Sequence, residues 1–220
     1  MDIKEAIKSR HSVRQYKDTP IPEDLIEKLD TLIDACNEQS GLRIQLITDD
    51  PGCFDSILGH YGKFKNVNNY IAIVGPKSLP DLDELSGYYG EQIVIAAQMM
   101  GLNTCWVAGT YSRSKCKCDR EAGEKIVCVI ALGYGETEGT KHRSKSVNEV
   151  CRVTVSDKPV WFRNGVRAAM MAPTAMNQQK FLIDMVEGEP VITAGRGPMS
   201  RIDLGIVKYN FEAASGHKCR

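Results

Sequence analysis

The sequence lacks an excess of charge of either sign. Its 220 residues include 28 Lys and Arg against 28 Asp and Glu, so the formal net charge at pH 7 is zero. A neutral chain has no global field that would attract nucleic acid or an anionic membrane surface. Any anion that the chain binds must therefore be held by a local group of cationic residues.

Long apolar runs are also missing. No stretch approaches the length of a transmembrane helix, and the first residues, MDIKEAIKSRHSVRQY, contain no continuous apolar segment typical of a secretory signal peptide. We therefore predict no membrane partner, no nucleic-acid partner and a cytoplasmic location.

The CxxC pairs that are typical of structural zinc sites are absent. Eight cysteines are present, but a chain of this length buries enough core to fold without disulfides, so free thiols are the expected state. Cys116 and Cys118 are one residue apart, with no histidine or second cysteine pair nearby in the sequence. We predict no metal site, and the sequence alone gives these two thiols no role.

Motifs for catalysis by side chains are absent too. The chain has no G-x-S-x-G elbow, no H-E-x-x-H helix and no P-loop lysine, and its four histidines stand in polar segments. A Cys–His pair brought together only by folding is left as an alternative. The segment 195–200, GRGPMS, has neither the third glycine nor the following acidic residue of a dinucleotide fingerprint, so we expect no Rossmann domain.

The periodicity of apolar residues predicts an α+β protein. The expected helices cover residues 3–9, a segment from Pro22 to near Cys36, and residues 85–100, 161–171 and 202–215. The expected strands cover residues 42–48, 70–74, 104–108, 126–132, 181–186 and 190–193.

The sequence also contains two patterns that each occur twice. A helix, polar loop and strand at 25–48 recur at 162–185, and the helical segment 85–101 recurs at 200–216. We interpret the chain as two unequal halves, 1–150 and 151–220, related by a pseudo-twofold axis, with chance similarity of short helices as the alternative.

Three polar segments stand out as candidate binding elements. Two are basic: one contains Arg10, His11 and Arg14, and the other, at 141–145, reads KHRSK. Guanidinium groups match phosphate oxygens well, so two such clusters that meet in space would hold a phosphate. The third, at 172–179, is rich in hydroxyl and amide groups that suit a heterocycle or a ribityl chain. Solvated surface charge and an unoccupied polar turn are the alternative interpretations.

These same segments carry a resemblance to a known family. RHSVRQY at 10–16, followed by a Pro-Glu helix start, resembles the N-terminal R-[RH]-S-x-[RK]-x-[FY] signature of the FMN-dependent nitroreductase superfamily. APTAMNQQ at 172–179 resembles its second signature, A-P-[ST]-x-x-N-x-Q, and the segments 87–109 and 131–136 resemble its long helix and two of its strands. The resemblance covers nearly the whole chain and implies a mixed, antiparallel sheet flanked by helices.

The position of the second signature departs from the usual family pattern. In ordinary members it follows the first long helix and crosses to the partner's flavin in an obligate homodimer. Here the first long helix is followed by NEQSG at 37–41, and the signature stands in the C-terminal half. This resembles a branch in which one chain imitates the two-subunit arrangement. It implies one FMN site per chain, where the halves meet, in a monomer that imitates a dimer or in a homodimer.

The resemblance also implies which residues contact FMN. The residues expected to contact the phosphate, the ribityl chain or the pyrimidine edge of FMN are Arg10, His11, Ser12 and Arg14. Lys141 and Arg143 are expected to bind the phosphate as well. Those expected from the second signature are Pro173, Thr174 and Asn177, and those expected over the isoalloxazine are Val107, Ala108 and Gly109.

If FMN binds, the flavin carries the chemistry, which agrees with the lack of an acid–base pair of side chains. The implied function is an oxidoreductase in which NADH or NADPH and a small-molecule acceptor use one pocket in turn, by ping-pong kinetics. Nitroaromatics, quinones and flavins are the expected acceptors. The alternatives are a non-catalytic flavin- or nucleotide-binding protein of the same fold and a thiol-rich structural protein.

Overall fold

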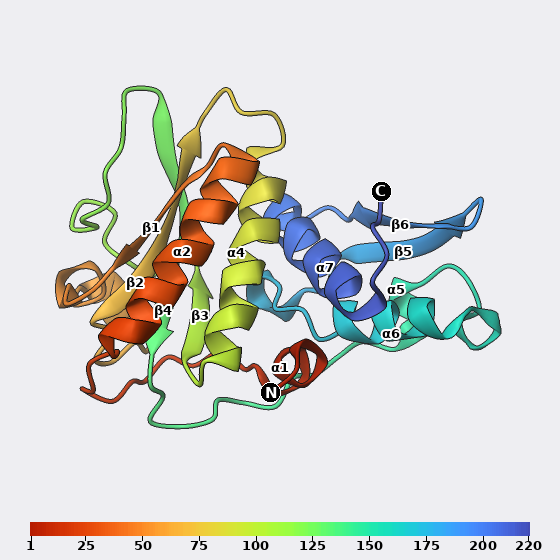
Figure 1. Cartoon of the computed structure of the whole chain (residues 1–220), viewed down its shortest axis with the longest axis horizontal. Helices are drawn as coiled ribbons and strands as arrows, with labels where there is room; N and C mark the ends of the chain where they lie inside the picture. The colour runs from red at the N-terminus through yellow and green to blue at the C-terminus, as the bar shows by residue number, and fades with distance from the viewer. The chain divides into compact units, whose positions relative to one another are not determined.

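The computed structural model describes residues 1–220, apart from the side chain of Leu58. Helices and strands are mixed along the chain, as the sequence predicts (Figure 1). The residues group into two compact units: unit 1 contains 1–9, 83–95 and 142–220, and unit 2 contains 10–82 and 96–141. Each unit is therefore assembled from separated stretches of sequence. These units differ from the predicted halves, 1–150 and 151–220, which were inferred from an internal duplication. That duplication stays a prediction.

Unit 2 is built on a four-stranded antiparallel sheet in the order β1-β2-β4-β3. The strands are β1 (Arg43–Ile47), β2 (Asn69–Pro76), β3 (Asn103–Val107) and β4 (Glu124–Gly133). The apolar residues of β2 and β4 form continuous buried runs rather than alternating with polar ones. Such runs are expected where both faces of a sheet are covered. The two central strands thus form the core of unit 2.

Helices and short turns complete this unit. Helix α2 (Glu23–Ser40) packs against β1 (Figure 1), and the 3-10 helix η1 (Pro51–Cys53) and helix α3 (Ile57–Tyr61) connect β1 to β2. The predicted end of α2 near Cys36 is wrong by about one turn. Gly41 adopts φ +71° and its N–H donates to the carbonyl of Asn37, a left-handed ending that glycine allows at low cost.

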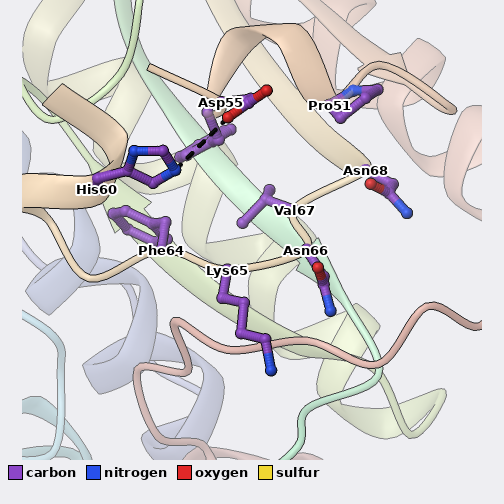
Figure 2. Close-up of a pocket in the computed structure, with 9 residues that line it drawn as sticks. Pro51, Asp55, His60, Phe64, Lys65, Asn66, Val67 and Asn68 are labelled. Carbon is purple, nitrogen blue, oxygen red and sulfur yellow. Dashed lines mark ion pairs between the residues drawn. The ribbon is translucent and has the colours of Figure 1, made fainter. Parts of the chain in front are cut away.

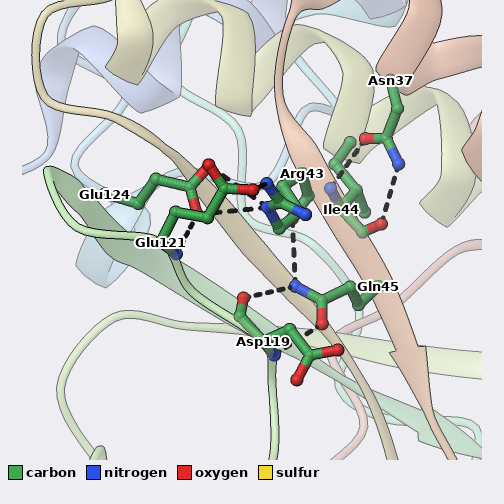
Figure 3. Close-up of polar contacts among 7 residues, drawn as sticks. All are labelled: Asn37, Arg43, Ile44, Gln45, Asp119, Glu121 and Glu124. Carbon is green, nitrogen blue, oxygen red and sulfur yellow. Dashed lines mark hydrogen bonds and ion pairs between the residues drawn. The ribbon is translucent and has the colours of Figure 1, made fainter.

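The side chain of Asn37 occupies part of the outer edge of β1 (Figure 3). The amide of Asn37 pairs with both backbone groups of Ile44, at 2.9 Å to the carbonyl and 2.7 Å from the N–H. Arg43 forms an ion pair of 3.1 Å with Glu124, at the start of β4, and a second one with Glu121. Because an open edge strand invites pairing with another chain, the two hydrogen bonds from Asn37 protect β1 at Ile44, whereas the ion pairs of Arg43 reach across β2 to β4.

Unit 1 contains a hairpin of β5 (Phe181–Val186) and β6 (Glu189–Ala194). Glu187 and Gly188 both have positive φ, as a two-residue type I′ turn requires. The hairpin is extended on both sides: the N–H of Arg152 donates to the carbonyl of Ile183, and Arg220 exchanges backbone hydrogen bonds with β6. The sequence prediction of β5 agrees with the structure at both ends.

The helices of unit 1 pack around a small apolar core. Helices α6 (Val160–Ala169) and α7 (Ser200–Ser215) lie side by side, and both contact α1 (Ile3–Ser9) (Figure 1). The shorter elements are α5 (Val147–Val150), η2 (Val155–Asp157) and η3 (Ala175–Asn177). The core contains Ala6, Ile7, Ile95, Ala168 and Ala214.

Helix α4 (Leu82–Met99) gives residues 83–95 to unit 1, where it crosses α7 at two glycines. A Cβ on Gly87 would lie 2.0 Å from the carbonyl oxygen of Ile202, and one on Gly205 would lie 1.9 Å from that of Glu84. Each glycine therefore meets the residue three positions before the other glycine. The backbones of α4 and α7 therefore approach closely at both glycines.

Across the residues described, none of the helices combines the length and the apolar character that a membrane span requires.

Candidate functional site

The N-terminal signature segment lies along the sheet of unit 2. Ser12 forms a parallel bridge with Thr104, and the N–H of Val13 donates to the carbonyl of Thr104 at 3.0 Å. Since β3 is an edge strand, this segment takes up its free side. Val13 and Tyr16 are buried, and the Tyr16 hydroxyl donates to the carbonyl of Val13 at 2.7 Å. The apolar and aromatic residues of the signature thus fix the backbone that carries its two arginines.

The segment that follows β4, residues 134–141, lies against the N-terminal signature segment. Tyr16 forms a bridge with Gly135, and the N–H of Glu136 donates to the carbonyl of Gln15 at 2.8 Å. Gly139 has φ +80°, and a Cβ there would lie 2.7 Å from the Cβ of His11. Only glycine allows both this conformation and this approach. The predicted site residue Lys141 follows two positions later in the sequence, and its role stays a prediction.

Positive charge is concentrated beside β3. Arg10 is only 4% exposed, whereas Arg14 is exposed. Burial raises the pKa of the Cys105 thiol on β3, and the nearby guanidinium groups of Arg14 and Arg10 oppose that shift. Both arginines therefore lie close enough to residue 105 to act on it electrostatically, which makes this edge of the sheet suited to an anion.

The residues predicted to pass over the flavin ring come at the end of β3. Val107 is buried, Ala108 is half-buried and Gly109 is exposed, with open space where its side chain would be. The backbone of Gly109 is thus open to approach by a planar ligand.

The second signature forms a tightly bonded loop in unit 1. Met176, Asn177 and Gln179 all have positive φ, between +46° and +53°. Residues with a side chain adopt this conformation rarely, and such strain is typical of positions that the surrounding structure or a function requires. Pro173 is buried and the hydroxyl of Thr174 accepts from the N–H of Gln179 at 3.0 Å.

Gln179 connects this loop to the late basic segment. Its amide nitrogen donates to the carbonyl of Arg143 at 2.9 Å, and its amide oxygen accepts from the N–H of Lys145 at 2.8 Å. Asn177 donates to the same carbonyl of Arg143, also at 2.9 Å, and accepts from Gln179. The structure thus brings the predicted residues Arg143 and Asn177 together, and both polar atoms of the Asn177 side chain have partners within the loop.

Two residues that order this loop were missed by sequence reasoning. Gln179 is the last residue of the second signature, but sequence reasoning did not assign it to the site. In the structure its side chain is buried, with only 4% exposed. Asp203, in the first turn of α7, accepts from the N–H of Ala175 at 2.9 Å and from the amide of Gln178 at 2.7 Å. Burial raises the pKa of the Asp203 carboxyl. Nothing in the local pattern around Asp203 indicates its partners, because they lie more than twenty residues away in the sequence.

We expect a Gln179→Ala variant to lose about 2 kcal/mol of unfolding free energy, because it leaves the N–H of Lys145 without its acceptor and the carbonyl of Arg143 with only one of its two amide donors. Chemical denaturation followed by circular dichroism measures this loss. A Met176→Ala variant is the matched control, since Met176 belongs to the same loop and is 81% exposed. An equal loss in both variants would contradict a specific role for Gln179.

A cavity of about 370 Å³ lies in unit 2, next to the signature segment (Figure 2). Phe54, His60, Phe64 and Lys65 are among the residues that line it, and His60 faces Asp55 at 3.5 Å. The backbone of Lys65 pairs with that of Gln15, and its side chain forms an ion pair of 3.0 Å with Glu136. Sequence reasoning did not single out this cavity, because its walls come from a stretch without regular periodicity.

The predicted site residues fall into two groups. The group in unit 2 contains Arg10, His11, Ser12, Arg14, Val107, Ala108, Gly109 and Lys141, and the group in unit 1 contains Arg143, Pro173, Thr174 and Asn177. Among the residues that the structure describes, no three His, Cys, Asp or Glu side chains are arranged to hold a metal ion.

An antiparallel sheet whose edge strand carries the R-H-S-V-R segment, together with the ordered A-P-T-x-x-N-x-Q loop, defines an α+β protein of the nitroreductase class. The chain belongs to the family described as "Putative TM nitroreductase", which matches residues 2–215. The resemblance deduced from the two signatures is thereby confirmed.

Individual relatives agree with this family. A protein of Methanothermobacter thermautotrophicus named "Putative NADH dehydrogenase/NAD(P)H nitroreductase" is 29% identical over 172 residues, which is 64% of this chain and 82% of that protein. The crystal structure of a "putative nitroreductase" from Thermotoga maritima has a TM-score of 0.71 at 22% identity, and the match covers 97% of this chain and 83% of that one. A structure from Desulfovibrio desulfuricans, described as a nitroreductase in complex with FMN, has a TM-score of 0.53 at 18% identity over 67% of this chain and 94% of that one.

Proposed function

We propose that this protein is an FMN-dependent oxidoreductase that passes reducing equivalents from NADH or NADPH to a small-molecule acceptor. The observation that carries the proposal is the Arg10–Arg14 segment, held along β3 with the Gly139 turn packed against His11. This segment places a buried and an exposed guanidinium beside one edge strand. The family of the chain and the FMN complex of one structural neighbour support the choice of flavin.

The chemistry of the donors fits the phosphate of FMN. A phosphate needs cationic groups whose charge is not already neutralised by a carboxylate. Within the residues described, the side chains of Arg14, Lys141 and Arg143 have no ion pair with an acidic residue, whereas Arg43 has two such partners. The hydroxyl of Ser12 adds a neutral donor of the kind that suits a ribityl chain.

The second group of predicted FMN contacts belongs to unit 1. Gln179 and Asn177 hold the loop from Pro173 to Asn177 to the backbone of Arg143. A loop ordered before binding loses little conformational entropy when a ligand arrives. We propose that this loop, like the Arg10–Arg14 segment, contacts FMN, as the second signature implies.

The protein's own residues would bind and orient rather than transfer protons. FMN, when bound, supplies the hydride chemistry between the nicotinamide and the acceptor. Arg10 and Arg14 would hold the cofactor through charge-assisted hydrogen bonds, and the open backbone at Gly109 would leave one ring face accessible. A nitroaromatic, a quinone or a second flavin is the acceptor class we propose, and NAD(P)H would use the same pocket before it.

The decisive test is the absorption spectrum of the purified protein together with its turnover. We expect flavin bands at about one FMN per chain, and NADH or NADPH oxidation that depends on an added nitroaromatic or quinone. Parallel lines in double-reciprocal plots would support the ping-pong scheme. A protein that binds FMN tightly but oxidises neither nucleotide would instead be a non-catalytic flavin-binding protein, and one that fails to bind FMN would overturn the proposal.

A further inference from the structure

Three cysteines from two separate segments of unit 2 meet beside its aromatic core. Cys53 ends the 3-10 helix η1 and is fully buried, while Cys116 and Cys118 belong to the loop between β3 and β4 and are half-buried. All three pack against the apolar cluster that contains Phe54 and Tyr70. The proposed flavin function uses none of these thiols.

Backbone contacts hold the two segments together on both sides of Cys116. The N–H of Ser112 donates to the carbonyl of Cys53 at 2.8 Å, before Cys116 in the sequence. After it, the N–H of Lys117 donates to the Tyr70 hydroxyl at 3.0 Å, and that hydroxyl donates to Asp50 at 2.6 Å. Because Lys117 also forms an ion pair of 3.2 Å with Asp50, the loop is fixed where the cysteines meet.

The three thiols act on one another and are not equivalent. The Cys53 thiol donates to the carbonyl of Ser112, 3.9 Å away at the start of the loop that carries Cys116. Interaction with Cys53 lowers the pKa of Cys116, and Tyr70 and Cys118 act in the same direction against the effect of burial. The pKa of Cys53 is raised by its interaction with Cys116 and by its burial. The pKa of Cys118 is raised to about 12 by burial and by the negative charge on Cys116. The thiol of the cluster whose pKa is lowered is therefore that of Cys116.

The surroundings of Cys116 suit a reactive thiolate. Lys115 and Lys117 flank it in the sequence and are both exposed. Reactive cysteines in proteins are partly accessible and lie in positively charged surroundings, whereas buried structural cysteines are inert. Asp50 is an acidic group in this region, and its carboxylate is bound by Tyr70 and Lys117.

We propose that Cys116 is a peroxide-sensitive thiolate and that Cys53 is its resolving thiol, so that unit 2 contains a reversible redox site separate from the flavin chemistry. Hydrogen peroxide is the reactant class. The Cys116 sulfur attacks one peroxide oxygen, the O–O bond breaks, and with one proton the products are a sulfenic acid and water. The Cys53 thiol then attacks the Cys116 sulfur; the S–O bond breaks, the disulfide forms and the lost hydroxide leaves as water with the thiol proton. A dithiol reductant restores the two thiols by exchange.

The first test is the pH dependence of alkylation by iodoacetamide in the full chain, read residue by residue after digestion. The groups around Cys116 are Cys53, Cys118, Tyr70, Tyr111, Asp50 and Lys117. Since the thiolate is the reacting form, the rate rises with pH through the pKa. We expect the midpoint at Cys116 to lie more than about one pH unit below the value of about 8.5 that is usual for an exposed thiol. A midpoint at or above that value would overturn the proposal.

The second test is peroxide treatment followed by mapping of disulfides without reduction. We expect the chain to lose two hydrogen atoms and to yield a peptide that joins Cys53 to Cys116. Cys118→Ala is the matched control, because it removes a half-buried thiol of the same loop and is expected to keep this cross-link. In Cys116→Ser we expect no cross-link at Cys53 and no fast peroxide consumption.

The wild-type chain alone decides the question if a cysteine variant fails to fold. A cross-link from Cys116 to Cys118, or a stable sulfenic acid with no cross-link, would overturn the assignment of Cys53 as resolving thiol. Unchanged thiols after treatment with a large excess of peroxide would overturn the whole proposal. None of these outcomes depends on whether FMN is bound.

Discussion

A Gly205→Ala variant is expected to lose about 3 kcal/mol of unfolding free energy, the upper end of the range for overpacked sites. The added Cβ would lie 1.9 Å from the carbonyl oxygen of Glu84 and 2.6 Å from the backbone nitrogen of Tyr88. Both are backbone atoms of α4, so the strain cannot be relieved by turning a side chain, and the two helices must separate. Denaturant titration measures the loss.

The expected sign is informative because alanine by itself stabilises a helix interior by about 1 kcal/mol relative to glycine. Gly165→Ala in α6 is the matched control: there the new Cβ would meet the ring of Phe211 at 2.6 Å, and a ring is able to shift. We expect a smaller loss in this control. A Gly205→Ala variant as stable as the wild type would contradict the close crossing of α4 and α7.

An Arg14→Ala variant is expected to bind FMN about 10- to 100-fold more weakly than the wild type, the value of one charged hydrogen-bonding group. Arg14 is exposed on the signature segment and has no acidic partner among the residues described. Its removal should therefore leave the fold intact. Titration of the apoprotein with FMN, followed by flavin fluorescence, gives the dissociation constant, and the thermal unfolding midpoint reports on the fold.

Two further variants separate a specific contact from a general effect of charge. Lys17→Ala removes the same unit of charge three residues later from an exposed position and should bind FMN as the wild type does. Arg14→Lys keeps the charge but loses the planar fork, so we expect an intermediate affinity. Equal losses in Arg14→Ala and Lys17→Ala would indicate only a diffuse electrostatic effect.

Much of the fold follows from local sequence pattern. β5, α1 and the strands of unit 2 are predicted because their apolar residues repeat with the period of the element or form unbroken runs. The end of α2 was misjudged because the apolar repeat stops at Cys36, whereas Ser40 and Gly41 continue and close the helix through hydrogen bonds. Capping, unlike burial, leaves little trace in hydrophobic periodicity.

The candidate site was predictable only as two short signatures. Neither pattern indicates that the Gly139 turn lies on His11 or that Gln179 binds the backbone of Arg143, because these contacts join segments far apart in the sequence. The thiol cluster was overlooked for the same reason: Cys116 and Cys118 look like an incomplete metal pair until Cys53 is placed beside them by the fold.

The interleaving of the two units has a consequence for how the chain is made. On the ribosome, unit 2 is complete once residue 141 has been added, whereas α1 is synthesised before it and must wait for α6 and α7. Until α7 emerges, Ala6, Ile7 and Ile95 lack the apolar neighbours that later bury them. Stalled or truncated chains would therefore present a folded unit 2 together with uncovered apolar helices, a state prone to aggregation and recognised by chaperones.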